Sequence, residues 1–429
     1  MPDAKIHKLK ALGLNISFRE APLTLTMLAA LVPNEMNART RLIDESVDKI
    51  PFDELFDLVG ISCLTGTALR GYAIADFFRN RGIPVVLGGI HVTLCPEEAL
   101  EHADSIVAGF AEKTWPQLLR DFRSGNMRKR YRSNQIDINT LPIPRRDLQR
   151  KFGYMSPNTV FATRGCKGRC DFCSVPTAGF GWHTRPIGQV IDEIKAIKSG
   201  RFVFNDVSLL EDRDYAKDLF TALIPLKKKW GGLCTTQIGA DDEMLELMHK
   251  SGCIYLLLGF ESVTNKSLYK INKGFNKPDT YVSLMSKLHD KNIIVQGCFI
   301  FGFDEDTTSI FEETVDAVND LKIDIPRYAI YTPYPGTSAY TRLKNQDRLL
   351  HEKWIHYDTQ HVVFKPAQMS PEELDSGFRW AFKQTFKFNS IVKRTASSGL
   401  YMPITFMGNL AYQMYVKRLQ REQNNILTN

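Results

Sequence analysis

The chain has 429 residues, of which 43% are hydrophobic and 24% are charged, a composition typical of globular proteins with two or three domains. The formal net charge is +7, but residues 376–429 contain eight Lys or Arg and one Glu, so the other residues are balanced. This distribution argues against a chain-wide nucleic-acid interface. Because we find no export signal and no apolar stretch that would span a bilayer, we expect a cytoplasmic protein.

Residues 10–125 alternate short apolar runs with helical patterns, which predicts a parallel sheet with crossover helices. The expected strands are 10–16, 40–44, 58–63, 84–88 and 105–109, and the expected helices are 23–32, 68–80, 97–103 and 114–123. This pattern favours a doubly wound α/β domain of flavodoxin type. Ligands of such domains bind beyond the carboxyl ends of the strands.

A second βα series follows a basic, proline-punctuated stretch at 126–157. Its expected strands are 159–163, 202–206, 233–238, 254–259, 293–301 and 327–331, and its expected helices are 187–198, 213–229, 241–251, 278–290 and 307–320. Six βα units indicate a partial (β/α)6 barrel rather than a complete eight-fold one. We therefore expect a first domain at 1–135, a linker at 136–157, the barrel at 158–345 and a helical C-terminal region at 346–429.

Three of the eight cysteines cluster as C-x-x-x-C-x-x-C, at Cys166, Cys170 and Cys173. Gly165 and Gly168 permit the backbone conformations that a tight wrap around a metal cluster requires. Three thiolates on a four-iron cluster leave one iron open, whereas electron-carrying clusters normally have four cysteine ligands. The alternative is structural zinc, which needs a fourth ligand such as His183. The scattered cysteines are interpreted as small buried hydrophobic residues.

The triplet, Phe172 before its last cysteine and the six βα units resemble the radical S-adenosylmethionine (SAM) superfamily over residues 158–340. The resemblance implies a [4Fe-4S] cluster whose open iron chelates SAM. An electron from the cluster then cleaves the sulfonium, and the resulting 5′-deoxyadenosyl radical abstracts hydrogen from an organic substrate. The cofactors carry this chemistry, and the protein supplies orientation and exclusion of water.

Further matches follow the later strands of the series. Asn205 and Asp206 stand where the family holds the SAM amino group, and Glu261 stands where it binds ribose hydroxyls. Gly297 belongs to a segment that resembles the family's fifth-strand glycine motif, which lets adenine approach the backbone. Residues 332–337 resemble the loop that closes the sixth unit. With Phe172, these residues form the expected SAM-binding set, while the catalytic residues are not identified.

The N-terminal region resembles the cobalamin-binding domains that are fused to radical SAM barrels. The matching residues are Ser62, Thr65, Gly88, Gly89, His91 and Gly109. Within this set, His91 is expected to be a loop or helix-cap residue rather than a metal ligand. The D-x-H-x-x-G motif that supplies histidine to cobalt is missing after the first strand, so cobalt is expected to lack a histidine ligand. The alternative is a domain without cobalamin that forms a wall of the substrate cavity.

In the C-terminal region, Phe378, Phe382 and Phe386 recur at helical spacing among basic residues. This pattern favours a helix packed across the barrel over an amphipathic contact with a membrane surface. A second aromatic group is expected to belong to the core: Tyr401, Phe406, Tyr412 and Tyr415.

The resemblances together predict a cobalamin-dependent C-methyltransferase. Two alternatives are a cobalamin-free radical SAM enzyme that oxidises, cyclises or rearranges its substrate, and a regulatory protein with a structural metal. The basic aromatic tail suits a tetrapyrrole or an isoprenoid lipid as substrate. A flavodoxin or ferredoxin is the expected reductase, and no nucleic-acid partner is expected.

Overall fold

A computed structural model of the protein describes residues 20–427, without the side chains of Tyr415, Val416 and residues 418–427. The chain divides into two compact units. The first contains the described residues up to Ser199, together with Pro333–Asp347 and His351–Asp358. The second contains Gly200–Thr332, Arg348–Leu350 and the described residues from Thr359 onward.

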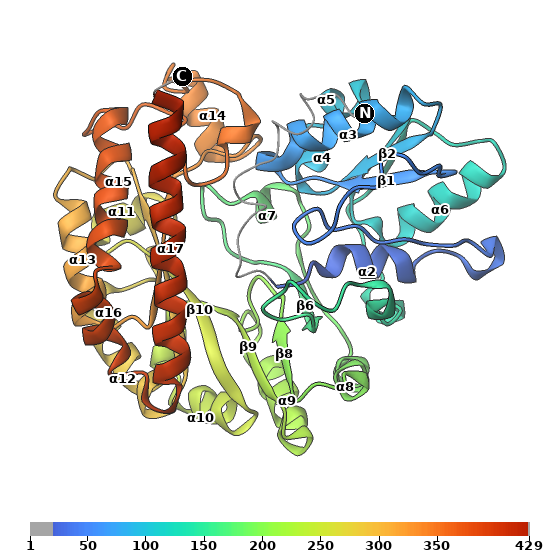
Figure 1. The fold of residues 1–429 in the computed structure, drawn as a ribbon. Helices are drawn as coiled ribbons and strands as arrows, with labels where there is room; N and C mark the ends of the chain where they lie inside the picture. Colours follow the sequence, from blue (N-terminus) through green and yellow to red (C-terminus); the bar gives the residue numbers. More distant parts are fainter. Residues whose placement is uncertain (1–19, 428–429) are drawn as a thin grey trace. The chain divides into compact units, whose positions relative to one another are not determined.

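The first unit is built on a parallel sheet with helices on both faces (Figure 1). Its strands are β1 (Val59–Ser62), β2 (Val85–Gly88), β3 (Ser105–Gly109) and β4 (Arg130–Ser133), paired in that order. The helices are α2 (Leu23–Ala30), α3 (Ala68–Arg79), α4 (Ile90–Leu94), α5 (Pro96–Glu101) and α6 (Ala111–Arg123). These elements confirm the α/β architecture with parallel strands.

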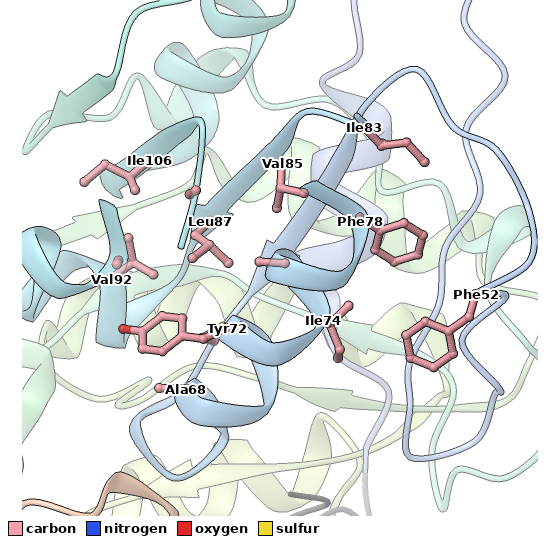
Figure 2. Packing of buried hydrophobic residues seen from close by; sticks show 14 residues of the cluster. Phe52, Ala68, Tyr72, Ile74, Phe78, Ile83, Val85, Leu87, Val92 and Ile106 are labelled. Atoms are coloured by element: carbon pink, nitrogen blue, oxygen red, sulfur yellow. The ribbon is translucent and has the colours of Figure 1, made fainter. Parts of the chain in front are cut away.

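Alternation along β2 explains why both faces of this sheet are covered, because successive strand residues point to opposite faces. Val85 and Leu87 join one buried cluster with residues of α3, whereas Val86 joins another with Leu118 of α6. Figure 2 shows the first cluster, in which the aromatic rings of Phe78 and Tyr72 come from α3. Strands that are buried on both faces have continuous apolar sequences, and β2 and β3 could be predicted from the sequence for this reason.

Two strand expectations in this unit are not confirmed, and one observed strand was not expected. Residues 10–16 lie outside the described residues. The expected strand at 40–44 is wrong, because this segment is irregular and is held by Asp44, which accepts hydrogen bonds from Ser46 and from Tyr154 Oη (2.9 Å). Strand β4 was missed because Tyr131 is its one buried residue and arginines flank it.

The rest of the first unit carries the cysteine triplet. It contains β5 (Thr159–Val160), β6 (Thr163–Gly165), α7 (Ser174–Thr177), β7 (Trp182–Thr184), α8 (Ile187–Ala196) and α14 (Ser338–Asn345). Strands β6 and β7 form an antiparallel hairpin, with Gly165 opposite Trp182. The triplet lies in the loop between these two strands. One strand expected at 159–163 is therefore two short strands in the structure.

The second unit contains five parallel strands in the order β12-β11-β10-β9-β8. They are β8 (Arg201–Phe204), β9 (Lys229–Cys234), β10 (Cys253–Glu261), β11 (Ile294–Phe301) and β12 (Ile325–Ile330). The intervening helices are α9 (Arg213–Leu223), α10 (Asp242–Lys250), α11 (Asn265–Lys270), α12 (Tyr281–Asp290) and α13 (Ile310–Asp320). Each expected βα step of this region is present.

Strand β9 is displaced from its expected position at 233–238, since it begins at Lys229 and residues 236–240 form a 3-10 helix. The glycine pair at 231–232 obscured the strand in the sequence. Gly231 lies under the ring of Tyr255 on β10, and a Cβ at this position would lie 2.8 Å from Tyr255 Cδ1. The missing side chain therefore makes room for a neighbouring strand's residue.

The chain ends in α15 (Pro371–Thr385), α16 (Phe388–Thr395) and α17 (Met402–Leu427), drawn in orange to red in Figure 1. Phe378, Phe382 and Phe386 are buried, and Phe382 packs edge-on against Tyr328 of β12 at 5.1 Å. The packed-helix interpretation of this stripe is confirmed. In the second aromatic group, Tyr401, Phe406 and Tyr412 are half-buried, and Tyr412 stacks on the buried ring of Phe386 with ring centres 5.6 Å apart. Tyr415 lies outside the described side chains.

Among residues 20–427, the helices include none with the length and apolar content that a membrane crossing requires.

Candidate functional site

The cysteine loop starts at Gly165, a position that only glycine can occupy. Gly165 ends β6 with φ +85°, and a Cβ there would lie 1.7 Å from the carbonyl oxygen of Gly181. Cys166 N donates to the same oxygen at 3.2 Å. The hairpin thus fixes the direction in which the chain leaves β6 and enters the loop.

Within the loop, Gly168 N donates to Cys166 Sγ at 3.2 Å, and Cys173 N donates to Cys170 O at 3.1 Å. All three cysteines are half-buried. Amide donors directed at a cysteine sulfur stabilise a thiolate and tune the potential of an iron-sulfur cluster. The three cysteines therefore lie in one short loop between β6 and α7, with an amide donor at the first sulfur.

Asp171 anchors the loop from within the triplet. Its side chain is buried and accepts a hydrogen bond from Arg342 Nη1 at 2.8 Å, while its carbonyl oxygen accepts from Ala339 N at 3.1 Å. Both partners belong to α14, whose N-cap is Thr337, accepting from Tyr340 N at 3.2 Å. The segment that sequence reasoning singled out as the closing loop therefore leads into the helix that supports the cysteine loop.

The surroundings of the loop are cationic and aromatic. Lys167 Nζ lies 4.4 Å from the ring centre of Trp182, and Arg164 is paired with Glu112 at 3.0 Å. His183 is not placed as a free ligand, because its Nε2 lies 3.0 Å from the carbonyl oxygen of Phe180. Phe172 is half-buried. A positive environment favours thiolates over thiols.

In the second unit, Asn205 and Asp206 directly follow β8, as expected. Asn205 is exposed, whereas Asp206 is buried. An exposed amide and a buried carboxylate are therefore adjacent at the carboxyl end of this strand. Both side-chain types accept hydrogen bonds from an ammonium group.

Glu261 ends β10 in an unusual backbone conformation. Its φ is +65°, and the register with β11 shifts between Gly259 and Glu261. Its carboxylate is buried and forms an ion pair with Lys273, whose Nζ also lies 3.3 Å from Gly259 O. Asn276 Nδ2 braces the bulge by donating to the carbonyl oxygens of Gly259 (2.8 Å) and Phe260 (2.9 Å). Lys273 and Asn276 were missed from the sequence.

Gly297 lies in the middle of β11, where space is limited. A Cβ there would lie 2.9 Å from Ile323 Cγ2 and 3.3 Å from the ring of Phe260. Phe260 in turn stacks on Phe299 with ring centres 5.3 Å apart. Within this unit the glycine is therefore explained by packing against these side chains.

In the first unit, the strand ends expected to bind cobalamin lie at one edge of the sheet. Ser62 is exposed at the end of β1 and lies opposite Gly88 of β2. Gly89 follows with φ +97°, and a Cβ there would lie 2.6 Å from Cys63 O and 2.9 Å from Ser62 Oγ. The two strand ends thus approach each other as closely as backbone permits.

Thr93 connects this edge to β3. Its hydroxyl donates to Gly89 O and accepts from Gly109 N, both at 2.9 Å. Gly109 has φ +81°, and a Cβ there would lie 2.1 Å from Ser133 O at the end of β4. Four strand ends are therefore held together through small residues and one threonine, a residue that sequence reasoning did not select.

His91 differs from its expected role. It lies inside α4 rather than in a loop or cap, and its side chain is completely buried. Nδ1 lies 3.3 Å from the hydroxyl of Thr65, which is also buried. Nearby, burial raises the pKa of the Cys95 thiol to about 12, with further contributions from the charges of Glu98 and Glu352.

Comparison with known proteins agrees with this domain order. A model of the radical SAM superfamily matches residues 160–318, and a model of the B12 binding domain matches residues 9–119. The chain is 32% identical over 388 residues to bacteriochlorophyllide d C-12(1)-methyltransferase of Chlorobaculum tepidum, covering 87% of this chain and 84% of that protein. It is 29% identical to the C-8(2)-methyltransferase of the same organism, covering 91% and 92%.

Solved structures show the same fold. The radical SAM methyltransferase TsrM from Kitasatospora setae, with cobalamin and a [4Fe-4S] cluster bound, has a TM-score of 0.61 at 15% identity over 86% of this chain and 90% of that one. The cobalamin-dependent radical enzyme OxsB has a TM-score of 0.62 at 15% identity over 92% of this chain and 70% of that one.

The fold and the matched domains define a radical SAM enzyme with a B12-binding domain. More specifically, the chain belongs to the cobalamin-dependent radical SAM methyltransferases. The cofactors of this class are a [4Fe-4S] cluster, SAM and cobalamin, and its substrates are small molecules. This membership decides against the regulatory protein with a structural metal.

The chain's own residues fit these groups in two places. The half-buried cysteines with an amide donor at Cys166 suit a thiolate-bound cluster. Gly88 and Gly89 leave an exposed hydroxyl at Ser62 with no side chains from the adjoining strand end to block it, which suits the close approach of a bulky nucleotide tail.

Proposed function

We propose that the protein transfers a methyl group from SAM to an unactivated carbon on the periphery of a chlorophyll-type tetrapyrrole. The observation that carries this proposal is the 32% identity, over most of both chains, to a methyltransferase named for bacteriochlorophyllide d. A second relative of nearly the same coverage is named for methylation at another position of the same pigment. Two related proteins with one substrate class favour that class for this chain.

The proposed cluster ligands are Cys166, Cys170 and Cys173. When bound, the cluster supplies the electron for cleavage of SAM. The chain's contribution is to hold three thiolates on a loop fixed at both ends, by Gly165 at its start and by the Asp171–Arg342 contact within it. Three thiolates would leave one iron of such a cluster without a protein ligand, and a loop fixed in this way would hold the cluster in a constant position.

The proposed SAM contacts are Phe172, Asn205, Asp206, Glu261 and Gly297. Asn205 is suited to accept a hydrogen bond from the amino group, since it is exposed directly after β8. Glu261 is held by Lys273 and by a braced bulge, which restricts its carboxylate to one orientation. An oriented carboxylate can accept from two neighbouring hydroxyls of a ribose.

The proposed cobalamin-binding set consists of Ser62, Thr65, Gly88, Gly89, His91 and Gly109. Support comes from Thr93, whose hydroxyl joins the ends of β2 and β3 through Gly89 and Gly109. Thr65 and His91 are buried and contact each other, so we assign them to the support of this edge rather than to its surface. The four-part division at 1–135, 136–157, 158–345 and 346–429 also stays a prediction.

Two partners extend this proposal. A flavodoxin or ferredoxin is the proposed electron donor. A membrane surface is a proposed contact of the C-terminal helices, where large apolar side chains are exposed between lysines: Phe388, Val392, Leu400, Ile404, Met407 and Met414. Exposed apolar side chains beside cations are typical of helices that lie on anionic lipid surfaces.

A cyclisation of the tetrapyrrole is the second candidate. It is favoured by 25% identity to an anaerobic magnesium-protoporphyrin IX monomethyl ester cyclase of Cereibacter sphaeroides, of which this chain covers 53%. The shorter match makes this candidate weaker than methylation.

The test is anaerobic incubation of the reconstituted protein with bacteriochlorophyllide d, SAM, cobalamin and dithionite, followed by mass spectrometry of the pigment. Methylation predicts a product heavier by one methylene group. A product lighter by two hydrogens, or an unchanged pigment beside consumed SAM, would contradict the proposed substrate and reaction.

A further inference from the structure

A group of three potential metal ligands lies in the first unit, away from the cysteine triplet in sequence. His91, Cys95 and Glu98 each offer one ligand atom, and these atoms all lie within 4.8 Å of one another. His91 lies in α4 and Glu98 in α5, and the non-helical backbone of Cys95 (φ −126°, ψ 60°) joins the two helices, so the three residues lie around one turn of the chain.

The imidazole of His91 is the independent observation that points to a ligand. The side chain is completely buried, and its Nε2 has no hydrogen-bond partner within the described part of the chain. Nδ1 lies 3.3 Å from Thr65 Oγ1. If Thr65 accepts from Nδ1–H, the lone pair of Nε2 is left facing Glu98, whose Oε1 is 3.6 Å away. A buried nitrogen without a partner requires an explanation, and a metal ion supplies one.

Glu98 is held in place by a second contact. Its two carboxylate oxygens each lie 2.9 Å from Trp354 Nε1, and the Trp354 ring packs edge-on against His91 at 5.6 Å. The side chain of Glu98 is 34% exposed and Cys95 is half-buried. The group therefore has an ordered, partly apolar wall and an open side through which an ion can enter.

The donor set selects the kind of ion. Imidazole nitrogen, thiolate sulfur and carboxylate oxygen are together the ligands of zinc, which accepts all three. Tetrahedral bonds of about 2.0–2.2 Å to nitrogen and oxygen separate these donors by about 3.4 Å. The 3.6 Å between His91 Nε2 and Glu98 Oε1 is close to this separation. The two positive charges of a zinc ion would balance the negative charges of one thiolate and one carboxylate.

We propose that His91, Cys95 and Glu98 bind one zinc ion, with water in the fourth position. The ion holds the α4–α5 segment, which directly follows Gly88 and Gly89, against the Trp354 segment. This proposal uses residues of the first unit alone and does not depend on the proposed substrate. It replaces the expectation that His91 is no metal ligand.

The test uses the cluster-loaded full chain, equilibrated anaerobically with one equivalent of zinc sulfate and then desalted. Iron and zinc are counted per chain by mass spectrometry, and zinc ligation is measured by X-ray absorption. The proposal predicts about one zinc per chain with one sulfur at about 2.3 Å and lighter donors at about 2.0–2.2 Å. Cys95→Ser and Glu98→Gln should lower zinc retention at least tenfold, while iron content and far-ultraviolet circular dichroism stay unchanged.

Cys253→Ala is the matched control, because Cys253 is a buried cysteine of the second unit. It should retain zinc like the unmodified protein. Absence of zinc from the unmodified protein, equal zinc in Cys95→Ser, or ligation by two or more sulfurs would each overturn the proposal. None of these results bears on pigment methylation, so failure of one proposal is distinguishable from failure of the other.

Discussion

Asp171 and Arg342, which are 171 residues apart in the chain, form an ion pair at 2.8 Å inside the cysteine loop. Asp171 stands between Cys170 and Cys173 in the sequence, and its carboxylate is buried. The guanidinium of Arg342 comes from α14. A buried carboxylate requires a partner, because an unpaired charge in the interior is costly. The contact therefore ties the geometry of the cysteine loop to α14, a helix that follows β12 in the chain.

Removing this tie is expected to weaken cluster binding without abolishing it. Arg342→Met removes one ion pair of the buried Asp171, at a cost of about 1–2 kcal/mol, which is kept low because Arg342 is over a third exposed. We expect a several-fold faster loss of iron to a chelator, followed by absorbance. Arg379→Met, which breaks a surface pair with Asp375 on α15, is the control and should lose iron at the normal rate. Equal rates in both variants would contradict the supporting role.

Replacing one cysteine of the triplet should abolish cluster formation. Cys170→Ala leaves two thiolates, too few to hold a four-iron cluster. Iron content should fall to background and SAM cleavage should cease, as measured by release of 5′-deoxyadenosine. Cys234→Ala, a change at a buried cysteine of β9, should keep both properties at a cost in stability of about 1 kcal/mol. Full SAM cleavage by Cys170→Ala would end the assignment of the triplet.

Two glycines with left-handed backbone allow the cost of backbone strain to be measured apart from the cost of steric overlap at the proposed cobalamin-binding strand ends. Gly109 and Gly125 have φ values of +81° and +74°, but a Cβ at Gly109 would lie 2.1 Å from Ser133 O, whereas Gly125 has open space. Gly125→Ala should cost about 1–2 kcal/mol from its left-handed backbone alone. Gly109→Ala should cost more and displace the strand ends, so it should lower the cobalamin content after reconstitution. The account fails if the two variants bind cobalamin equally.

Glu261→Gln tests the proposed ribose contact. The change removes a buried charge that is paired with Lys273, so the bulge at the end of β10 loses its fixed geometry. We expect the KM for SAM to rise about tenfold, equivalent to about 1.4 kcal/mol of lost binding, with a smaller effect on the KM for the pigment. Glu312→Gln, at an exposed position of α13, should leave both constants unchanged. An unchanged KM for SAM in Glu261→Gln would exclude the contact.

Asp306 should make stability depend on pH in a narrow window. Burial raises the pKa of this carboxyl to about 6, although Ser267 Oγ and the amides of Gly302 and Phe303 donate to it. Because the folded-state pKa lies above the ordinary value of 3.8, the protonated group contributes stability below pH 4, which is lost as pH rises through 6.

Asp306→Asn keeps the position neutral at all pH values. The thermal midpoint of the metal-free variant should therefore fall less between pH 4 and pH 6 than that of the unmodified protein. Asp316→Asn, at an exposed position of α13, is the control and should follow the unmodified protein. A steeper fall in Asp306→Asn would show that the carboxyl is not protonated in the fold.

The βα order was predictable because buried parallel strands are continuous apolar runs and their helices have clear periodicity. Strands β2, β3 and β11 are of this kind. The missed or displaced strands have a common cause: the local sequence pattern does not show which side chains of other elements pack against a strand. In β4, Tyr131 is the one buried side chain and arginines flank it. In β9, Gly231 leaves room for the ring of Tyr255 on the neighbouring strand, so the sequence has no apolar side chain there.

The candidate site was predictable where spacing alone carries chemistry. The cysteine triplet and the glycines at strand ends are of this kind. Arg342, Lys273 and Thr93 were not predictable, because each acts on a residue that is distant in sequence or on a backbone atom. His91 was expected in a loop or helix cap, whereas its burial inside α4 depends on contacts with Thr65, Glu98 and Trp354, which are distant or separate in sequence.

The most direct test of the central claim is a product count in one anaerobic reaction with bacteriochlorophyllide d, SAM and a reductant. A cobalamin-dependent radical methyltransferase consumes one SAM as methyl donor and another as radical source. We predict S-adenosylhomocysteine, 5′-deoxyadenosine and methylated pigment in equal amounts. Production of 5′-deoxyadenosine with neither S-adenosylhomocysteine nor methylated pigment would contradict the account.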